Sequence, residues 1–218
     1  MNDVLATHAR AWPPVPMWNR SVAPTMPNRQ APMLWLVGMH GGAGVSSLTA
    51  SLPFAGDAGT RWPGNIGASK GLDSPFVVAV ARTHLHGLVA LHNALLSHMN
   101  GATPVNTQLA GVITVADSDR PLPKSVQVRR DTIESLAVEL GGAAWRLGWI
   151  EPWRSLEQRE LPAWDHRSAT PAKVGDRDAR LVPPSTVQTL AHSMYTTVGE
   201  AVRRYMFANP HSSQSAAG

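Results

Sequence analysis

Cysteine is absent from this chain of 218 residues, which excludes disulfide bonds and thiolate metal sites. That absence suits a reducing compartment, so we expect a cytoplasmic location. No apolar run approaches the roughly 20 residues that a membrane-spanning helix needs, so we expect no transmembrane segment. The first residues contain His8 and Arg10 followed by prolines and no apolar stretch, which argues against a secretory signal.

Lysine is also scarce, since Lys70, Lys124 and Lys173 are the only lysines, and the net charge is +4. The longest runs of basic residues are the pairs Arg129-Arg130 and Arg203-Arg204. Nucleic-acid-binding proteins usually present a denser cationic face. The sequence therefore supports a nucleic-acid partner only weakly, and solvated helix faces explain these charges better.

The most informative stretch is Leu34–Thr49, which reads LWLVGMHGGAGVSSLT. An apolar run leads into four glycines, after which two serines precede a leucine: Gly38, Gly41, Gly42, Gly44, Ser46, Ser47 and Leu48. This is the layout of a strand, a phosphate-cradling loop and the start of a helix. Glycine allows backbone N–H groups to converge on an anion, because no Cβ blocks the approach. We expect an anion to bind against the amides of residues 42–46.

This loop resembles the deviant P-loop of the ParA/MinD family of ATPases, Lys-Gly-Gly-x-Gly-Lys-[Ser/Thr]-[Ser/Thr]. The resemblance implies a site for ATP and magnesium, with Ser46 as the magnesium ligand. His40 and Val45 stand at the two lysine positions, so two charge-assisted contacts of about 1.5–3 kcal/mol each are missing. We therefore expect weak binding, little or no ATP hydrolysis, and no active ATPase. The implied cofactor-binding residues are His40, Gly41, Gly42, Ala43, Gly44, Val45, Ser46, Ser47 and Arg82.

Arg82 follows the apolar run of residues 76–81 and has two readings. It replaces a lost lysine on phosphate, or it forms a salt bridge with Asp117 or Asp119. Asp57 also has two readings, a turn residue or an outer partner of magnesium, and the turn is favoured.

Histidine and tryptophan supply two weaker signals. His84 and His86 lie two residues apart, and a metal site there needs a third ligand that the sequence does not fix. Trp145, Trp149 and Trp153 are expected either to pack in the core or to form a partner-facing patch.

Apolar strands alternate with amphipathic helices along the rest of the chain. Strands are predicted at residues 34–37, 76–81, 110–115 and 144–147, and helices at 45–52, 84–99, 124–140 and 185–207. No clear strand is predicted over residues 54–74. The alternation predicts an α/β fold, a parallel sheet with helices on both faces, in a shortened P-loop NTPase-like form. The carboxyl ends of the strands are expected to gather the site.

Three regions are predicted. Residues 1–32 form a flexible proline-rich arm that contributes to partner binding, residues 33–207 form the P-loop-like domain, and residues 208–218 form a disordered tail. Residues 164–184 are a loop before the terminal helix.

Residues 33–154 also resemble a group of small proteins from actinobacterial mobile elements, through the GGAG loop, the Ala-Arg-Thr strand end and the Trp-Ile-Glu-x-Trp-Arg segment. The resemblances imply a degenerate nucleotide- or phosphate-binding protein that serves plasmid maintenance or conjugation, with an unidentified protein partner and dimerisation by family analogy. The alternative is a non-catalytic interaction module in which the glycine loop is only a tight connection.

Overall fold

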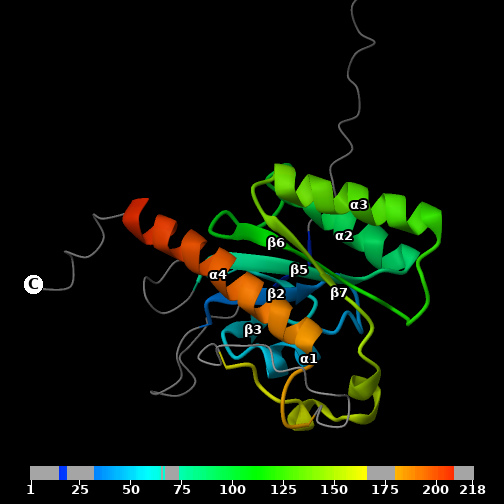
Figure 1. Cartoon of the computed structure of the whole chain (residues 1–218). Helices are drawn as coiled ribbons and strands as arrows, with labels where there is room; N and C mark the ends of the chain where they lie inside the picture. The colour runs from blue at the N-terminus through cyan, green and yellow to red at the C-terminus, as the bar shows by residue number, and fades with distance from the viewer. Residues whose placement is uncertain (1–14, 19–31, 65, 67–73, 166–179, 209–218) are drawn as a thin grey trace, which may run out of the picture.

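A computed structural model describes residues 15–18, 32–64, 66, 74–165 and 180–208 (Figure 1). Five parallel strands form one sheet in the order β3-β2-β5-β6-β7. Their bounds are β2 Leu34–Gly38, β3 Ala55–Asp57, β5 Phe76–Arg82, β6 Gln108–Val115 and β7 Ala143–Leu147. The helices are α1 Val45–Ser51, α2 Leu85–Met99, α3 Lys124–Glu139 and α4 Ser185–Ala208, with short 3-10 turns η1 Glu151–Ser155 and η2 Gln158–Glu160.

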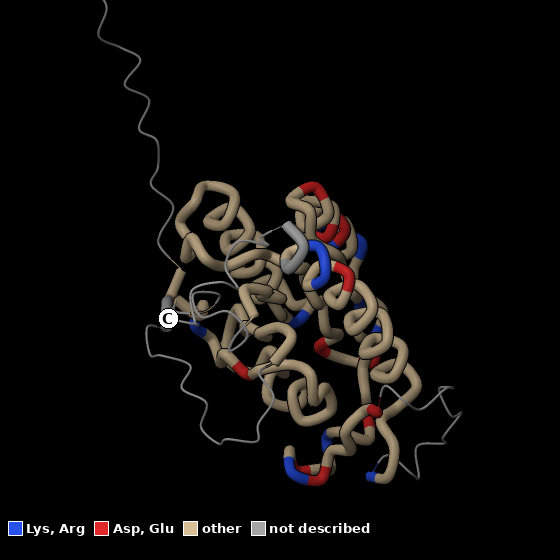
Figure 2. The backbone as a smooth tube through the Cα atoms, turned by 90° about the vertical axis from the view of Figure 1, so that its left-hand side faces the viewer, with Lys and Arg blue, Asp and Glu red and all other residues tan. Residues whose placement is uncertain are grey.

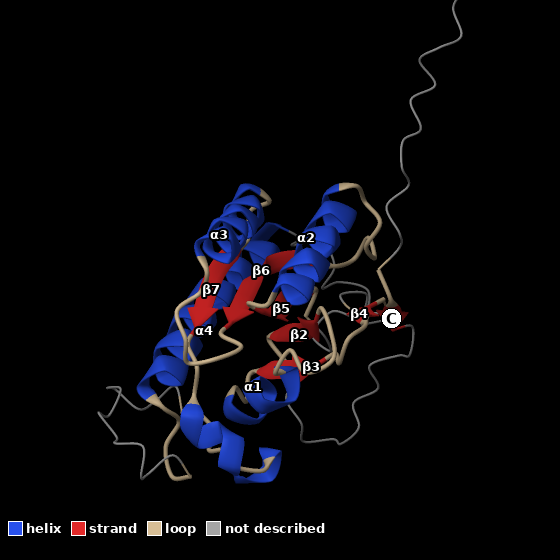
Figure 3. Cartoon of the chain, turned by 90° about the vertical axis from the view of Figure 1, so that its right-hand side faces the viewer, coloured by secondary structure: helices blue, strands red, loops and turns tan. Residues whose placement is uncertain are grey.

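Helices cover both faces of the sheet. Successive side chains of a strand point to opposite faces, and the central strands have apolar side chains on both faces that must be buried. Helices α2 and α3 cover one face, and α1 and α4 cover the other (Figure 3). On β5, Val78 and Val80 pack toward the α1 and α4 side, whereas Val77 and Ala79 pack toward α2 and α3. The prediction of an α/β fold with a parallel sheet and helices on both faces is confirmed.

The edge strand β3 contradicts the prediction that residues 54–74 contain no clear strand. It pairs with β2 over three residues, from Leu34 opposite Ala55 to Leu36 opposite Asp57. The sequence pattern did not predict this strand because Gly56 lies at its centre and glycine is depleted in strands. Its place in the structure explains the choice, since a Cβ there would lie 2.7 Å from the ring of Trp35.

Two very short strands lie outside the main sheet. Residues Met17–Trp18 (β1) pair in parallel with Trp62–Pro63 (β4), and the Trp62 amide donates to the carbonyl of Pro16 at 2.7 Å. Apart from these few positions, the predicted arm of residues 1–32 lies outside the described residues. Residues 209–218 of the predicted tail and most of the loop of residues 164–184 also lie outside them, whereas Ala208, which was predicted to begin the tail, is the last residue of α4.

The chain order of the strands reverses between β2 and β5. From β2 the chain passes through α1 to β3 on one side, and the strands from β5 onward lie on the other side. Such a switch point opens a crevice at the carboxyl ends of the strands, where ligands of α/β sheets bind. The loop after β2 and the residues after β5 flank this point.

None of the helices in the described part of the chain is long and apolar enough to cross a membrane.

Candidate functional site

The glycine loop connects the interior strand β2 directly to α1, as predicted. Gly42 and Gly44 have φ angles of 77° and 97°, a left-handed conformation that glycine adopts without a steric penalty. Gly44 is the residue that precedes the first helical turn. The two glycines turn the chain so that the loop curls at the carboxyl edge of the sheet.

Six amides of this loop have no acceptor among the described residues. In the segment from residue 41 to residue 47, only the Ala43 amide donates within the protein, to the His40 carbonyl at 3.4 Å, and the next bonded amide is that of Leu48. The six are those of Gly41, Gly42, Gly44, Val45, Ser46 and Ser47. Converging backbone donors without acceptors form a concavity suited to an anion.

His40 holds the loop in place and does not face a ligand. Its Nε2 accepts a hydrogen bond from the Arg82 amide at 3.0 Å, and its Nδ1 lies 2.8 Å from the Gly41 carbonyl. The ring proton is therefore on Nδ1, where it donates to that carbonyl. Both nitrogens are used inside the protein, so His40 ties the loop to the end of β5 and has no donor left for a phosphate.

Arg82 lies over the loop, but not in the predicted salt bridge with Asp117 or Asp119. Its Nε donates to the Gly42 carbonyl at 3.0 Å, and its Nη1 donates to the Ala116 carbonyl at 2.9 Å. The Asp117 carboxylate instead accepts from the Thr83 hydroxyl at 3.0 Å. The second terminal nitrogen of Arg82, Nη2, has no acceptor among the described residues and lies 3.9 Å from the position of a Cβ built on Gly44. Arg82 thus supplies a fixed cation beside the loop amides.

Ser46 and Asp57 meet at the other side of the loop. The Ser46 hydroxyl donates to Asp57 Oδ2 at 2.8 Å, and the Gly59 amide donates to Asp57 Oδ1 at 2.7 Å. Asp57 is therefore a turn residue and also the partner of the predicted magnesium ligand. Both side chains are exposed to solvent, so their oxygens are accessible.

Two predicted site residues point away from the cradle. Val45 is 6% exposed and packs in the core with Leu48, and Ala43 is also buried there. Their backbone groups belong to the loop, whereas their side chains stabilise it from below. Val45 stands at the position of the phosphate-binding lysine of the resembling family, and its side chain points into the core.

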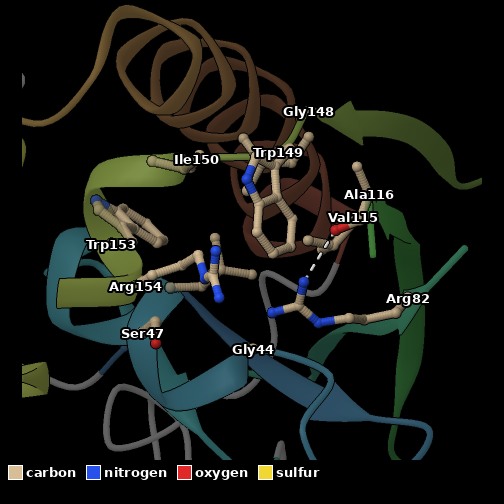
Figure 4. A pocket seen from close by; sticks show the side chains of 12 residues that line it. Gly44, Ser47, Arg82, Val115, Ala116, Gly148, Trp149, Ile150, Trp153 and Arg154 are labelled. Atoms are coloured by element: carbon tan, nitrogen blue, oxygen red, sulfur yellow. Dashed lines mark hydrogen bonds between the residues drawn. The ribbon is translucent and has the colours of Figure 1, made fainter. Parts of the chain in front are cut away.

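A cavity of about 160 Å³ adjoins the loop on the side of α1. Figure 4 shows Arg82 and Arg154 directed into it from opposite sides, with Trp149 above and Gly44 and Ser47 below. None of its twelve lining residues is acidic. Trp149 and Arg154 are cavity residues that the sequence did not assign to the site, although the Trp-Ile-Glu-Pro-Trp-Arg segment that contains them stood out.

The three tryptophans have different environments. Trp145 is buried, and its Nε1 donates to the Ser193 hydroxyl of α4 at 3.0 Å. Trp149 and Trp153 are both half-buried and both line the cavity, and Trp153 also packs against the hydrophobic core. Of the two predictions, packing in the core is the one that describes Trp145 and Trp153.

Three histidine rings gather beside the loop without forming a metal site. The His40 ring lies 4.7 Å from that of His84 and 6.3 Å from that of His86, centroid to centroid. The described residues include no group of three or more histidines and carboxylates placed to hold a metal ion. His84 Nδ1 accepts the Gly87 amide at 3.0 Å and thereby caps the first turn of α2.

Burial lowers the pKa of His84 below its ordinary value of 6.5, and the neighbouring His40, His86 and Arg82 lower it further against the opposing charge of Asp117. The unfolded chain then binds a proton before the folded chain does, so folding stability decreases as the pH falls below about 6.5. We expect His84→Asn, which keeps a capping acceptor but does not titrate, to reduce this loss.

Urea unfolding of both proteins at about pH 8 and about pH 5.5 tests this expectation. Burial also lowers the pKa of His98, so some loss should remain in the variant. If the difference in unfolding free energy between the two pH values is the same in both proteins, His84 does not carry the effect.

A comparison with protein-family models finds no match to this chain, and a comparison with curated proteins finds none either.

Proposed function

We propose that this protein binds a phosphate-type oxyanion at the Gly38–Ser47 loop and does not turn it over. The observation that carries the proposal is the set of six loop amides without an acceptor at the switch point of the sheet. Arg82 Nη2 adds a positive charge on the same side, and guanidinium groups bind phosphate well. An oxyanion bound here would accept hydrogen bonds from donors that have no acceptor in the described part of the chain.

Magnesium fits the opposite side of this loop. Hydroxyl and carboxylate oxygens are the ligands that Mg²⁺ accepts, and Ser46 and Asp57 offer both within one hydrogen bond. A cation there would offset the repulsion between the Asp57 carboxylate and a bound anion. In this proposal Ser46 and Asp57 hold magnesium, and the loop amides and Arg82 hold the anion.

The ParA/MinD resemblance offers a nucleotide as the source of the phosphate group, which is the alternative to a free oxyanion. It also extends the proposal to a cytoplasmic role in plasmid maintenance or conjugation, with dimerisation as in that family. These parts depend on the resemblance of the loop and of the later strands.

Hydrolysis is expected to be undetectable, because Val45 stands where the resembling family has its phosphate-binding lysine, and transition-state charge would be stabilised poorly. We expect that Val45→Lys does not create an ATPase. The Val45 side chain packs in the core, so an ammonium there must escape to water or lose hydration, at a cost of about 1–3 kcal/mol. Phosphate release and a melting curve of the variant measure both effects. A turnover near once per second in either protein would contradict the proposal.

Calorimetry with pyrophosphate, with and without magnesium, tests the loop as the site. Gly44→Val puts a branched side chain at a φ of 97°, beside Arg82 Nη2, and should abolish binding. Gly141→Val is the matched control, because residue 141 has a φ of 84°, no atom within 4 Å of a built Cβ, and a position at the opposite edge of the sheet. Unchanged affinity in a folded Gly44→Val protein would place the site elsewhere.

A second candidate is the interaction module, which the edge strand β7 favours. Within the described residues strand β7 pairs with β6 alone, and its other side faces a groove of about 630 Å³ between α3 and α4. The charged side chains near this groove are largely paired within the protein. The Glu134 carboxylate accepts hydrogen bonds from the Thr114 hydroxyl and the Arg146 guanidinium, and Arg146 also forms an ion pair with Asp131. Basic and acidic positions are interspersed over the described chain (Figure 2), which suits a protein partner better than a nucleic acid. Retention of this partner by Gly44→Val would favour the module.

A further inference from the structure

The cavity beside the glycine loop contains two arginines from separate elements. Arg82 comes from the end of β5, and Arg154 comes from η1 after the last strand. Figure 4 shows their guanidinium groups directed toward one another across the cavity. No carboxylate lines the cavity among the described residues, and Glu151, the acidic partner of Arg154, lies outside the lining.

Arg154 is held in this position by its own turn. Its Nη1 donates to Glu151 Oε1 at 3.2 Å, and its guanidinium carbon lies 5.8 Å from the centre of the Trp149 ring. The other Glu151 oxygen accepts the Trp149 indole N–H. Glu151 therefore fixes Trp149 and Arg154 as one unit, which covers the cavity opposite α1.

The size of the cavity restricts what enters it. Pockets that enclose drug-sized ligands measure about 300–1,000 Å³, whereas this one measures about 160 Å³. The half-buried indole of Trp149 and the side chain of Arg154 line the cavity opposite Gly44 and Ser47, so they restrict the space beyond an anion bound at the loop. The two arginines that line the cavity favour an anionic ligand, and the small volume of the cavity favours an anion without a large organic group.

We infer that the site takes a small, multiply charged oxyanion of the phosphate or pyrophosphate class, clasped between Arg82 and Arg154, and that Trp149 excludes a nucleoside. The inference rests on the proposed function of the loop, and it names the ligand class of that site. Arg82 is fixed on two carbonyls and holds the anion against the loop amides. Arg154 closes on the anion from the other side, and Trp149 keeps the cavity short.

Calorimetric titrations with pyrophosphate, inorganic phosphate, AMP and ATP test this selectivity on the full chain. We expect pyrophosphate to bind at least about tenfold more tightly than ATP. Arg154→Gln should weaken pyrophosphate binding by about tenfold, because a charge-assisted contact is lost. Arg154 is 66% exposed, so the variant should fold normally. Arg129→Gln, which removes the same charge from an exposed position on α3, is the control and should bind like the wild type.

Trp149→Ala gives a readout that a merely structural role would not produce. Removing the indole should enlarge the cavity and raise the affinity for ATP relative to pyrophosphate. ATP binding as tightly as pyrophosphate to the wild type, or wild-type pyrophosphate affinity in Arg154→Gln, would overturn the inference. If one of these results overturned the inference but Gly44→Val still abolished binding of the preferred ligand, the proposed function would stand without the inference. If no oxyanion bound the wild type, both would fail.

Discussion

Gly87→Ala should destabilise the protein by about 3 kcal/mol, although alanine in a helix normally stabilises relative to glycine. A Cβ at residue 87 would lie 2.4 Å from the Arg82 carbonyl oxygen and 2.8 Å from His40 Nε2. The carbonyl belongs to the end of the central strand β5 and has little room to move. The clash therefore shifts either α2 or the bond by which His40 holds the loop.

Urea unfolding measures this loss, and Gly41→Ala is the matched control. A Cβ at residue 41 meets no atom within 4 Å, and the residue has no positive φ, so we expect a change within about 0.5 kcal/mol. The Gly87→Ala protein should also lose affinity for pyrophosphate, because the loop loses its link to β5. A Gly87→Ala protein as stable as the wild type would contradict the packing of α2 against β5.

Arg82→Ala should weaken pyrophosphate binding by about 10- to 100-fold, since a hydrogen bond to a charged group contributes about 1.5–3 kcal/mol. The substitution removes the fixed cation and also frees the Gly42 and Ala116 carbonyls that it joins. Arg82→Lys restores the charge but not the planar fork, so it should recover only part of the affinity.

Calorimetry of both variants beside Arg129→Ala separates this local effect from the general loss of one positive charge. Arg129 is exposed on α3, away from the loop. Equal losses of pyrophosphate affinity in Arg82→Ala and Arg129→Ala would show that Arg82 acts only through the net charge of the protein. Arg82 would then not be part of the proposed site.

The sequence predicts most of the fold because its main strands are long, apolar and rich in valine. Residues 76–81 are continuously apolar, as a strand covered on both faces must be, and β5 is buried throughout except at Arg82. Strand β3 escaped prediction because it has three residues and a central glycine. That glycine is required by the ring of Trp35, a contact made across the sheet that local sequence does not reveal.

The backbone of the candidate site was predictable, whereas the roles of its side chains were not. The spacing of glycines identifies the loop, since only glycine accepts the φ angles found at Gly42 and Gly44. The roles of His40 and Arg82 depend on hydrogen bonds between residues about 40 positions apart, such as His40 Nε2 with the Arg82 amide. Such bonds are decided by tertiary packing, so the sequence alone does not distinguish them from a salt bridge to Asp117 or Asp119.

The sequence did not predict that Trp149 and Arg154 line the cavity, for a similar reason. A 3-10 turn after the last strand brings them back over α1, and the path of that turn is not encoded in a simple periodicity. The aromatic and proline content of the segment was its only signal.

Residue-resolved NMR of the pure protein, titrated with pyrophosphate in the presence of magnesium, tests the central claim most directly. The account predicts that the backbone amides of Gly41, Gly42 and Gly44–Ser47 shift together along one binding curve, with the Arg82 side-chain N–H signals. These six amides and Arg82 Nη2 lack an acceptor among the described residues, whereas the other Arg82 nitrogens report on the side chain that borders the site. Shifts confined to other parts of the chain, such as the outer edge of β7, or no shifts at millimolar pyrophosphate, would contradict it.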